Sequence, residues 1–423
     1  MTRAAQLQAL SDEDVVVADA RSAPKVLRPE FAPEHVLSAD LSIHTDLSAV
    51  EDEWRHFERN ADCTAFQSFD WLSTWQRHIG RRQGITPVIA VGRYAGGEIA
   101  LILPLAVEPR MPGRRLCWLG QNLCDYTGPL LARDFAACVS RDRFLQMWRD
   151  GLALIRRDPR TRYDWIELEK MPYRIGRQAN PFTYLDVAFN PSGAHFTRLG
   201  DSWEKFYFDK RSSATRRHDR TKRRRLAAFG EVRFASCTDL DDARRTTETL
   251  MRQKSRALTR RGISDVFARA GCREFFLDLA TNPNTRHLVH ISRIEVGTVW
   301  AALNLGVVFG DCYYHVVASY EDCELARFGP GALHLRELMA HAIGRGLKRF
   351  DFTIGDERYK LEWSDSHLKL CNHVAAATWR GRPASAWAKA RNSIKRFIKQ
   401  TPAVWRMVNA ARSAIGSLRA LPR

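Results

Sequence analysis

Two apolar hairpin patterns, 200 residues apart, constrain the fold of this chain more than any other feature of its sequence. Residues 87–107 hold two apolar runs around a glycine-containing turn at 95–97, and residues 288–308 repeat the arrangement around 295–297. The positions that match are Val91 and Ile291, Arg93 and Arg293, Gly97 and Gly297, Ile99 and Val299, Leu103 and Leu303, and Leu105 and Leu305. Short apolar runs joined by a glycine turn predict paired antiparallel strands. The repeat therefore predicts two copies of one α/β fold, and 423 residues are enough for two such domains.

Composition divides the chain into four segments. Residues 1–38 contain three prolines and little periodicity, which predicts a disordered lead-in. We expect a first domain over 39–190 and a second over 191–380, because prolines at 172, 181 and 191 mark a boundary between them. Residues 381–423 show apolar residues at helical spacing among many basic ones, which predicts basic amphipathic helices.

The positive charge of the chain is concentrated in two segments. Residues 210–225 carry nine basic residues and one acid, Asp219, and residues 381–423 carry ten basic residues and no acid. The formal net charge is +18, so the rest of the chain is neutral. A basic face can bind nucleic acid, anionic lipid or a polyphosphate ligand. For 381–423 we expect an anionic membrane surface, with packing against the body as the alternative.

The nine cysteines and the apolar segments indicate a cytoplasmic protein. The cysteines are scattered without a Cys-x-x-Cys pair, which favours reduced thiols over disulfides or a zinc site, and we expect no metal. No secretion signal is visible, and the longest apolar runs are about half the ~20 residues that a spanning helix requires. We therefore expect a cytoplasmic chain that is peripheral at the inner face of the membrane.

A glycine turn in the second half indicates a phosphate-binding site. The sequence Phe328-Gly329-Pro330-Gly331-Ala332 follows apolar strands and precedes a helical pattern. Glycines let a backbone approach a pyrophosphate, and the N-terminus of a helix offers unpaired N–H groups and a positive dipole end. An ordinary turn before a helix is the alternative interpretation of this motif.

The order of motifs resembles GNAT-type acyltransferases, and in particular the CelD-like group associated with cellulose and exopolysaccharide biosynthesis, which is related to the Fem-type peptidyltransferases. The resemblance covers roughly residues 40–380. In the second half it is carried by strands at 300–317, the helix start at 328–331, Gly346, Phe350-Asp351-Phe352, Gly355-Asp356-Glu357, Tyr359-Lys360 and Trp363. In the first half it is carried by Phe66-Gln67-Ser68, Trp71, the hairpin, Asp125-Tyr126 and Gly128-Pro129-Leu130, and it also includes the basic run at 216–225.

The resemblance implies a fold and a donor. The fold is a tandem of GNAT-like domains, each a mixed, mostly antiparallel sheet flanked by helices, with the acceptor in or near the cleft between them. The donor is an acyl-CoA, acetyl-CoA above all, whose pyrophosphate lies on residues 328–332. One departure is that Ala326 stands where such loops usually begin with Gln or Arg, and Arg327 comes one place later. Fem-type relatives use aminoacyl-tRNA instead, so the donor stays open.

Acyl transfer to an amine or hydroxyl requires a base, a group that stabilises the oxyanion and an acid for the departing thiolate. Tyr359 is the candidate acid, and Lys360 is the candidate that stabilises the oxyanion or neutralises a phosphate. Asp351 lies among apolar strand residues, so we expect it to be paired or to have a shifted pKa; it is either the base or a helix cap. His315 is the other candidate base, with a structural role as the alternative.

Asp125 and Tyr126 are the candidate acceptor-binding residues, and their alternative is an ordinary polar loop. The resemblance implies that the acceptor is a polysaccharide or cell-envelope precursor. Two other functions remain open at this level. One is a Fem-like aminoacyl transferase, whose basic helix holds tRNA, and the other is a non-catalytic module that binds nucleic acid or lipid.

Overall fold

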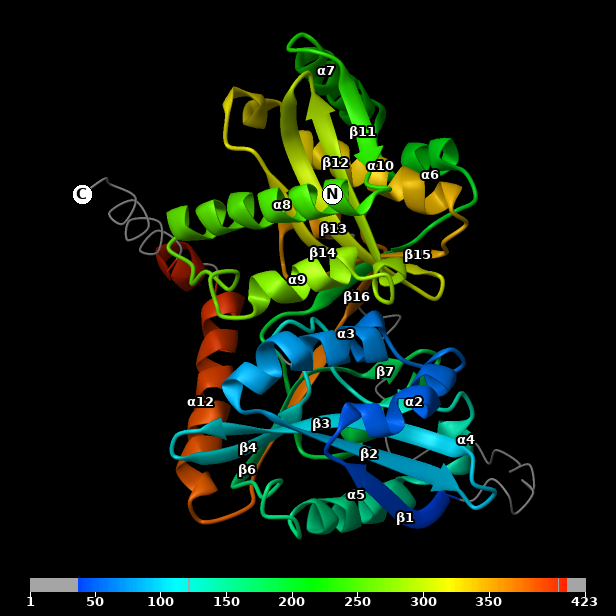
Figure 1. Cartoon of the computed structure of the whole chain (residues 1–423). Coiled ribbons are helices and arrows are strands. Elements are labelled where there is room, and N and C mark those ends of the chain that lie inside the picture. The colour runs from blue at the N-terminus through cyan, green and yellow to red at the C-terminus, as the bar shows by residue number, and fades with distance from the viewer. Residues whose placement is uncertain (1–36, 121, 402, 409–423) are drawn as a thin grey trace, which may run out of the picture.

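The computed structural model describes residues 37–120, 122–401 and 403–408, and it divides them between two β-sheets that lie one above the other (Figure 1). The predicted lead-in lies outside the described residues, except that Leu37 and Ser38 begin the first strand. The basic tail beyond residue 408 also lies outside them. No helix in the described ranges is both long and apolar enough to cross a membrane.

The first sheet follows the order β1-β2-β3-β4-β6-β17-β9 and is antiparallel except between β4 and β6. A short strand, β5 (Leu130–Leu131), pairs with β3, and β7 (Arg174–Ile175) and β8 (Gln178–Ala179) form a separate ribbon. The strands of the sheet are β1 (Leu37–His44), β2 (Thr86–Tyr94), β3 (Ile99–Arg110), β4 (Gly113–Trp118), β6 (Trp165–Pro172), β17 (Leu370–Ala376) and β9 (Val187–Phe189).

The second sheet follows the order β11-β12-β13-β14-β15-β10-β16 and is parallel only between β14 and β15. Its strands are β11 (Val232–Ser236), β12 (Val289–Val296), β13 (Val299–Phe309), β14 (Cys312–Tyr320), β15 (Arg349–Ile354), β10 (Ala194–Arg198) and β16 (Ser366–Leu368). The predicted hairpins are β2–β3 and β12–β13, and each has a register shift close to its turn. The prediction of two mixed, mostly antiparallel sheets is confirmed.

One strand from the second half of the chain joins the first sheet. β10 follows the linker at residue 190 and pairs with β15 in the second sheet, whereas β17 returns from the end of the second unit and pairs with β6 in the first. Residues 370–376, which the sequence placed in the second domain, therefore belong to the first sheet. The helix that follows, α12 (Gly381–Gln400), lies along one side of both units (Figure 1). Pairing between strands about 200 residues apart leaves no local pattern, so the sequence could not reveal it.

Helices cover both faces of each sheet, and the alternation of buried side chains explains how. Along β2, Ile89 and Val91 face the helices α2 and α3, while Val88 and Ala90 face α5. In the second unit, α8 and α9 cover one face, and α6, α7 and α10 cover the other. The helices are α2 (Glu51–Glu58), α3 (Phe69–Trp75), α4 (Phe135–Cys138), α5 (Arg141–Ile155), α6 (Trp203–Lys210), α7 (Ser213–Ala227), α8 (Leu240–Arg260), α9 (Cys272–Thr281), α10 (Pro330–Gly344) and α11 (Arg358–Trp363).

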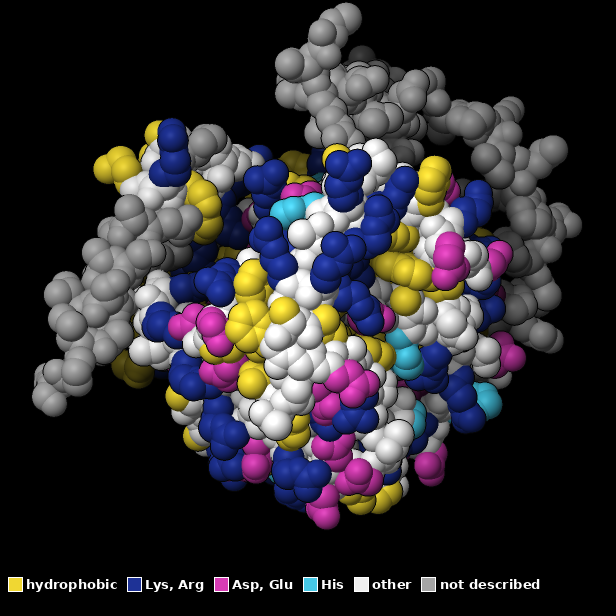
Figure 2. All heavy atoms as spheres, turned by 90° about the horizontal axis from the view of Figure 1, so that it is seen from above, with side chains coloured by type: hydrophobic (Ala, Val, Ile, Leu, Met, Phe, Trp, Pro, Cys, Tyr) yellow, Lys and Arg dark blue, Asp and Glu magenta, His cyan; other side chains and the backbone are white. Residues whose placement is uncertain are grey.

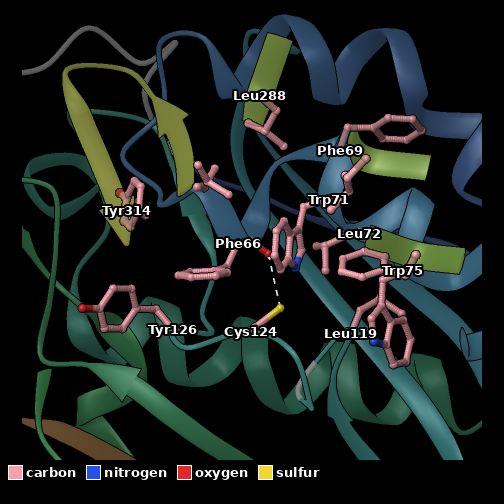
Figure 3. Packing of buried hydrophobic residues seen from close by; sticks show 14 of the residues in the cluster. Phe66, Phe69, Trp71, Leu72, Trp75, Leu119, Cys124, Tyr126, Leu288 and Tyr314 are labelled. Atoms are coloured by element: carbon pink, nitrogen blue, oxygen red, sulfur yellow. Dashed lines mark hydrogen bonds between the residues drawn. The ribbon is translucent and has the colours of Figure 1, made fainter. Parts of the chain in front are cut away.

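One continuous apolar core joins the two units. The rings of Trp71 on α3 and Phe275 on α9 pack edge to face at 5.0 Å. Phe66 packs in the same way against Tyr126 at 5.7 Å and against Tyr314 of β14 at 5.8 Å (Figure 3). Burial of these large rings fixes the first unit against β14 of the second. The same packing holds the loop that contains Tyr126 against the second sheet.

Candidate active site

The parallel strands β14 and β15 pair over only three residues and then separate. Their ladder runs from Cys312 with Arg349 to Tyr314 with Asp351. Directly after Tyr314, Val316 drops out of the register between β14 and β13, which is a β-bulge. A bulge and the end of a ladder leave backbone groups without strand partners at one place. A ligand can therefore bind backbone N–H groups at this point of the sheet.

Asp351 is buried at this point and takes its hydrogen bonds from both units. The hydroxyl of Tyr126 donates to Oδ1 at 2.7 Å, and the backbone N–H of Thr353 donates to the same atom at 2.8 Å. Burial raises the pKa of Asp351 to about 6, although both hydrogen bonds oppose the shift. The carboxyl group therefore exchanges its proton close to neutral pH. The pair brings together a predicted catalytic residue and a predicted acceptor-binding residue.

Backbone strain is concentrated beside this pair. Thr353 and Lys170 are the non-glycine residues with positive φ in the described ranges, at 61° and 59°. Such a conformation is an outlier for a β-branched residue and costs of the order of 1–3 kcal/mol. Strain of this kind clusters at functional sites, because only a surrounding structure that over-determines the conformation holds it in place.

Asp125 lies between the two strained residues. Burial raises the pKa of its carboxyl group, while the Lys170 ammonium, a hydrogen bond with the Thr353 side chain and the charge of Lys360 oppose that shift. The ammonium of Lys170 itself donates to the carbonyl oxygen of Cys124 at 2.7 Å. Asp125 is thus held in a polar cluster formed by both units.

Tyr359 and Lys360 lie on the short helix α11, and Lys360 is buried. Its Nζ donates to the carbonyl oxygen of Ile354 at 2.7 Å and pairs with Glu357 at 3.1 Å. Burial, helped by the negative charges of Glu357 and Asp125, raises the pKa of the Tyr359 phenol well above its usual value. Tyr359 therefore keeps its proton at neutral pH, as a general acid must.

His315 lies beside the same cluster, but its environment does not suit a general base. Burial and the nearby ammonium groups of Lys360 and Lys254 lower its pKa to about 3. With the amide of Asn304 oriented to satisfy its own hydrogen bonds, Asn304 donates to Nε2 of His315 at 3.2 Å. A neutral imidazole whose acceptor nitrogen is occupied favours the structural alternative for His315.

The predicted phosphate loop forms the start of α10. Gly329 has a φ of 68° and is the N-cap, Pro330 and Gly331 follow in the first turn, and no side chain caps the helix. Phe328 packs on Phe229, with ring centroids 5.8 Å apart. In this turn Pro330 has no N–H and the N–H of Ala332 donates to the carbonyl oxygen of Gly329, which leaves the N–H of Gly331 and the positive dipole end available to a ligand.

A lysine from the basic helix lies beside this loop, which the sequence did not reveal. Nζ of Lys222, on α7, lies 3.6 Å from the point where a Cβ atom on Gly329 would stand. The loop itself has Ala326 at the position where the resemblance predicts Gln or Arg, so Lys222 places a cation beside the loop from another element. The only sequence signal for it was the basic run itself, which does not specify which residue faces the loop.

The loop lies at the C-terminal end of β14, and the cluster around Asp351 lies near the middle of the same strand. Gly331 lies against Tyr320, the last residue of β14, whereas His315 lies near its middle. At about 3.3 Å per residue, the two positions are roughly 17 Å apart along the strand. Of the predicted site residues, the structure brings together Asp125, Tyr126, His315, Asp351, Tyr359 and Lys360. It leaves Phe328, Gly329, Pro330, Gly331 and Ala332 at the C-terminal end of β14.

A cavity of about 910 Å³ opens between the units beside Glu357. It contains cations from three elements, aromatic rings and the exposed end of α12, and the sequence predicted none of this arrangement. Its lining includes Phe189, Arg261, Glu357, His367, Lys369, Arg396, Lys399 and Trp405. A polar cavity at a domain interface, adjacent to a catalytic cluster, is a candidate substrate pocket.

His195, whose neighbour His367 lines this cavity, was also missed. It is 2 % exposed, and neither ring nitrogen has a hydrogen-bond partner among the residues that the structure describes. On the sheet it stands between Thr353 of β15 and His367 of β16, and its ring lies 4.9 Å from that of His367. Burial and nearby positive charge lower its pKa to about 4, so it is neutral at pH 7. A single histidine in a strand carries no sequence signal of such a position.

No group of three or more His, Cys, Asp or Glu side chains is arranged to hold a metal ion in the described part of the chain. The thiols of the buried cysteines are likewise no nucleophiles at neutral pH. Burial raises the pKa of Cys124, for example, to about 12.

Comparison with known proteins supports this description. Residues 213–361 match the family model of the acetyltransferase (GNAT) domain. This segment of the second unit is similar to GNAT-type acetyltransferase domains. The matched segment contains the α7 helix, the phosphate loop, Asp351 and Lys360, and the two sheets form a tandem of GNAT-like units, so the predicted fold is confirmed. No curated protein matches the sequence.

Two solved structures share the fold of about four fifths of the chain. FemX matches with a TM-score of 0.53 and 10 % identity over 78 % of this chain and 96 % of FemX. A conserved protein from Bacteroides thetaiotaomicron VPI-5482 matches with a TM-score of 0.50 and 10 % identity over 80 % of this chain and all of that one. At this level of identity the likeness concerns the fold alone.

Proposed function

We propose that this chain transfers an acyl group, preferentially acetyl, from acyl-CoA to an amine or hydroxyl of a polysaccharide or cell-envelope precursor. The observation that carries the proposal is the arrangement along β14. An uncapped helix N-terminus beside Lys222 lies at one end of this strand, and a cluster of perturbed carboxyl, phenol and ammonium groups lies near its middle. Acyl-CoA has the same division, with its phosphates at one end and its reactive thioester at the other.

The donor end binds phosphate through backbone and charge. The first turn of α10 offers the N–H of Gly331 and a positive dipole end to the pyrophosphate, and Gly329 and Gly331 allow its close approach. Lys222 supplies a positive charge at the same place. The pantetheine arm then runs along β14 to the bulge at Val316, where the strands separate.

The reaction is direct attack on the thioester. The acceptor nitrogen or oxygen forms a bond to the carbonyl carbon and loses its proton to the carboxylate of Asp351, whose pKa of about 6 leaves it deprotonated at pH 7. The carbon–sulfur bond breaks, and the departing thiolate takes the proton of Tyr359. Lys360 stabilises the oxyanion electrostatically. Asp125 and Tyr126 orient the acceptor and Asp351, and His315 positions the neighbouring side chains.

The acceptor occupies the cavity between the units. It lies beside Glu357, three residues from Lys360, and Arg261, Lys369 and Arg396 give it a cationic lining. The rings of Phe189 and Trp405 offer apolar faces of the kind on which sugars stack. The CelD-like resemblance of the sequence supports a polysaccharide or cell-envelope precursor, and both N- and O-acylation agree with Asp351 as the base.

A second candidate function is supported by the outer face of α7. Arg217, Arg220 and Arg224 are exposed at helical spacing, beyond the lysine that faces the loop. Seen from above α7, Lys and Arg side chains gather over this end of the molecule (Figure 2). Such a surface suits the phosphates of an RNA. The alternative is therefore aminoacyl-tRNA-dependent transfer by the same catalytic cluster.

Donor binding distinguishes these functions. We expect acetyl-CoA to raise the melting temperature of the protein, because a ligand that binds only the native state stabilises it by mass action. The expected control is that Tyr359→Phe and Lys360→Ala bind acetyl-CoA but do not turn it over. Salt-sensitive binding of aminoacyl-tRNA without any shift by acyl-CoAs would establish the alternative. Unchanged activity in both variants would refute the proposed chemistry.

A further inference from the structure

The C-terminal helix α12 is fixed to the body along one face. Ser385 and Ala388 are buried against the first unit. Arg391 donates to Glu167 at 2.6 Å and to Glu169 at 2.8 Å, both on β6. These contacts fix the rotation of the helix about its axis. They also correct the expectation that the cations of the tail are unopposed, since Arg391 has two carboxylate partners.

The opposite face of α12 exposes large apolar side chains. Trp387 is 66 % exposed, Ile394 52 % and Phe397 63 %. With Ala390, which is also exposed, they follow a spacing of three or four residues and therefore form one stripe along the helix. We call residues 387, 390, 394 and 397 the apolar stripe. Single exposed apolar residues are ordinary, but a continuous stripe on a helix marks an interaction surface.

Basic side chains flank the apolar stripe on both sides. At 100° per residue, Arg391 and Lys395 project from one side of it, and Arg382 and Lys389 from the other. The helix contains no acidic residue at all. Apolar residues with Trp and Phe among them, bordered by Lys and Arg, are the pattern of a helix that lies in the surface of an anionic bilayer.

We propose that the apolar stripe of α12 binds the surface of an anionic lipid bilayer. The rings of Trp387 and Phe397 and the side chain of Ile394 enter the interfacial layer. The exposed flanking cations Arg382, Lys389 and Lys395 contact lipid phosphates. Charge argues against a second copy of the chain as the occupant. Two such helices packed stripe to stripe would bring together only basic flanks, with no acidic residue on either helix.

Docking in this way places the cavity near the lipid headgroups. Arg396, Lys399 and Gln400, at the end of α12, line the cavity between the units. A bilayer on the outer face of the same helix therefore lies close to the cavity. This consequence rests on the proposed function, because it implies an acceptor held at a membrane surface. The docking itself does not depend on which reaction the site performs.

The experiment is flotation of the full chain with vesicles of phosphatidylcholine, with and without phosphatidylglycerol. We expect flotation with the anionic vesicles only, reduced by high salt. The double variant Trp387→Ser and Phe397→Ser should lose at least tenfold in the bound fraction. The matched control is Phe208→Ser, which removes a 64 % exposed ring on α6 and should float like the unaltered protein. All variants should keep the melting temperature, since only exposed rings change.

Three results would overturn the proposal. The first is no binding to anionic vesicles by the unaltered chain. The second is that the double variant binds as well as the unaltered chain. If truncation after residue 408 then removes the binding, the lipid-binding segment lies beyond α12. The third is a dimer by light scattering that becomes a monomer in the double variant, which would identify the apolar stripe as a self-association surface. A tenfold loss by the control variant would show that binding is not specific to α12.

Discussion

The two units have the same strand order, but they differ at the N-terminus of the helix that leads into the parallel strand. This N-terminus is capped by a side chain in the first unit and uncapped in the second. In the first unit, α5 connects β4 to the parallel strand β6, and the side chain of Ser140 accepts a hydrogen bond from the N–H of Arg143. In the second unit, α10 connects β14 to β15, and no side chain caps it. A capped end satisfies its own backbone, whereas an open end beside Lys222 can bind an anion. Under the proposed function, the same fold serves as a scaffold in the first unit and as the donor site in the second.

The two units also differ in the buried carboxyl group on the parallel strand, which has arginine partners in the first unit and none of this kind among its hydrogen bonds in the second. Glu167 on β6 is buried, but Arg115 at 3.0 Å and Arg391 offset the effect of burial and keep its pKa below the usual value. Asp351 on β15 is buried with a tyrosine and a backbone N–H as partners, and its pKa rises to about 6. Because its arginine partners keep Glu167 ionised, its role is to hold the structure together and not to exchange a proton. The weaker compensation of Asp351 leaves it able to exchange a proton.

Exchanging the carboxylates for amides tests this difference most strongly. Asp351→Asn keeps an oxygen for Tyr126 and Thr353 but cannot accept a proton, so we expect kcat to fall by roughly 10²–10⁴-fold. The raised pKa means that the folded state favours the protonated form. Its contribution to stability is present below pH 4 and is lost as the pH rises to about 6.

At a pH above about 6, Asp351→Asn should therefore be more stable than the unaltered protein although it has lost activity. A shift of about two pKa units corresponds to roughly 3 kcal/mol, which sets the upper limit of the gain in the free energy of unfolding at pH 8. Glu167→Gln is the control. It leaves Arg115 buried without its full charge partner and should destabilise the protein by a few kcal/mol, about 3 to 5 at most. Destabilisation by both variants would contradict the distinction between the two carboxyl groups.

The pH dependence of the reaction sharpens the role of Asp351. If its carboxylate is the base, kcat/KM rises about tenfold per pH unit below pH 6 and levels off above it. Tyr126→Phe removes a hydrogen bond that lowers the pKa of Asp351, so the rising limb should move to higher pH. An unchanged limb in this variant would assign the titration to another group.

The open helix end is tested by removing its cation. Lys222→Ala should raise the Kd of acetyl-CoA about tenfold, in line with roughly 1.5 kcal/mol for a hydrogen bond to a charged group, while kcat stays the same. The measurement is titration calorimetry together with steady-state kinetics. Arg224→Ala, two residues along α7 and exposed, is the control and should leave acetyl-CoA binding unchanged. If Arg224→Ala weakens binding as much, general charge rather than the loop holds the donor.

The sequence predicted those parts of the fold that depend on local patterns of residues. The repeated hairpins around Gly97 and Gly297 revealed the duplication, and the glycine loop before α10 was placed correctly at a helix start. The sequence also contains a capping-box pattern at Ser48 and Glu51, but in the structure Asp46 accepts the capping hydrogen bond there, and the box is formed by Thr64 and Gln67 instead. Both sites offer the same residue types, and the tertiary path of the chain decides between them.

The parts that the sequence could not predict depend on distant contacts. The side chain of Lys222 beside Gly329, the contact of Tyr126 with Asp351, and the addition of β17 to the first sheet each join residues more than 100 positions apart. His195 between Thr353 and His367 is of the same kind. No periodicity or motif records such contacts, since they follow from packing rather than from local preference.

The variant with the smallest expected effect tests the cap at the N-terminus of α5. Ser140→Ala removes the hydrogen bond to the N–H of Arg143 and should cost about 1 kcal/mol of stability, which corresponds to a decrease in melting temperature of roughly 2–4 °C. Because α5 lies on the first unit, away from β14, acetyl-CoA binding should not change. Thermal unfolding with and without acetyl-CoA measures both quantities. An additional anion site created at α5, seen as a second binding event for acetyl-CoA, would show that capping alone separates the scaffold from the donor site. A single unchanged event shows that the glycines and Lys222 are required as well.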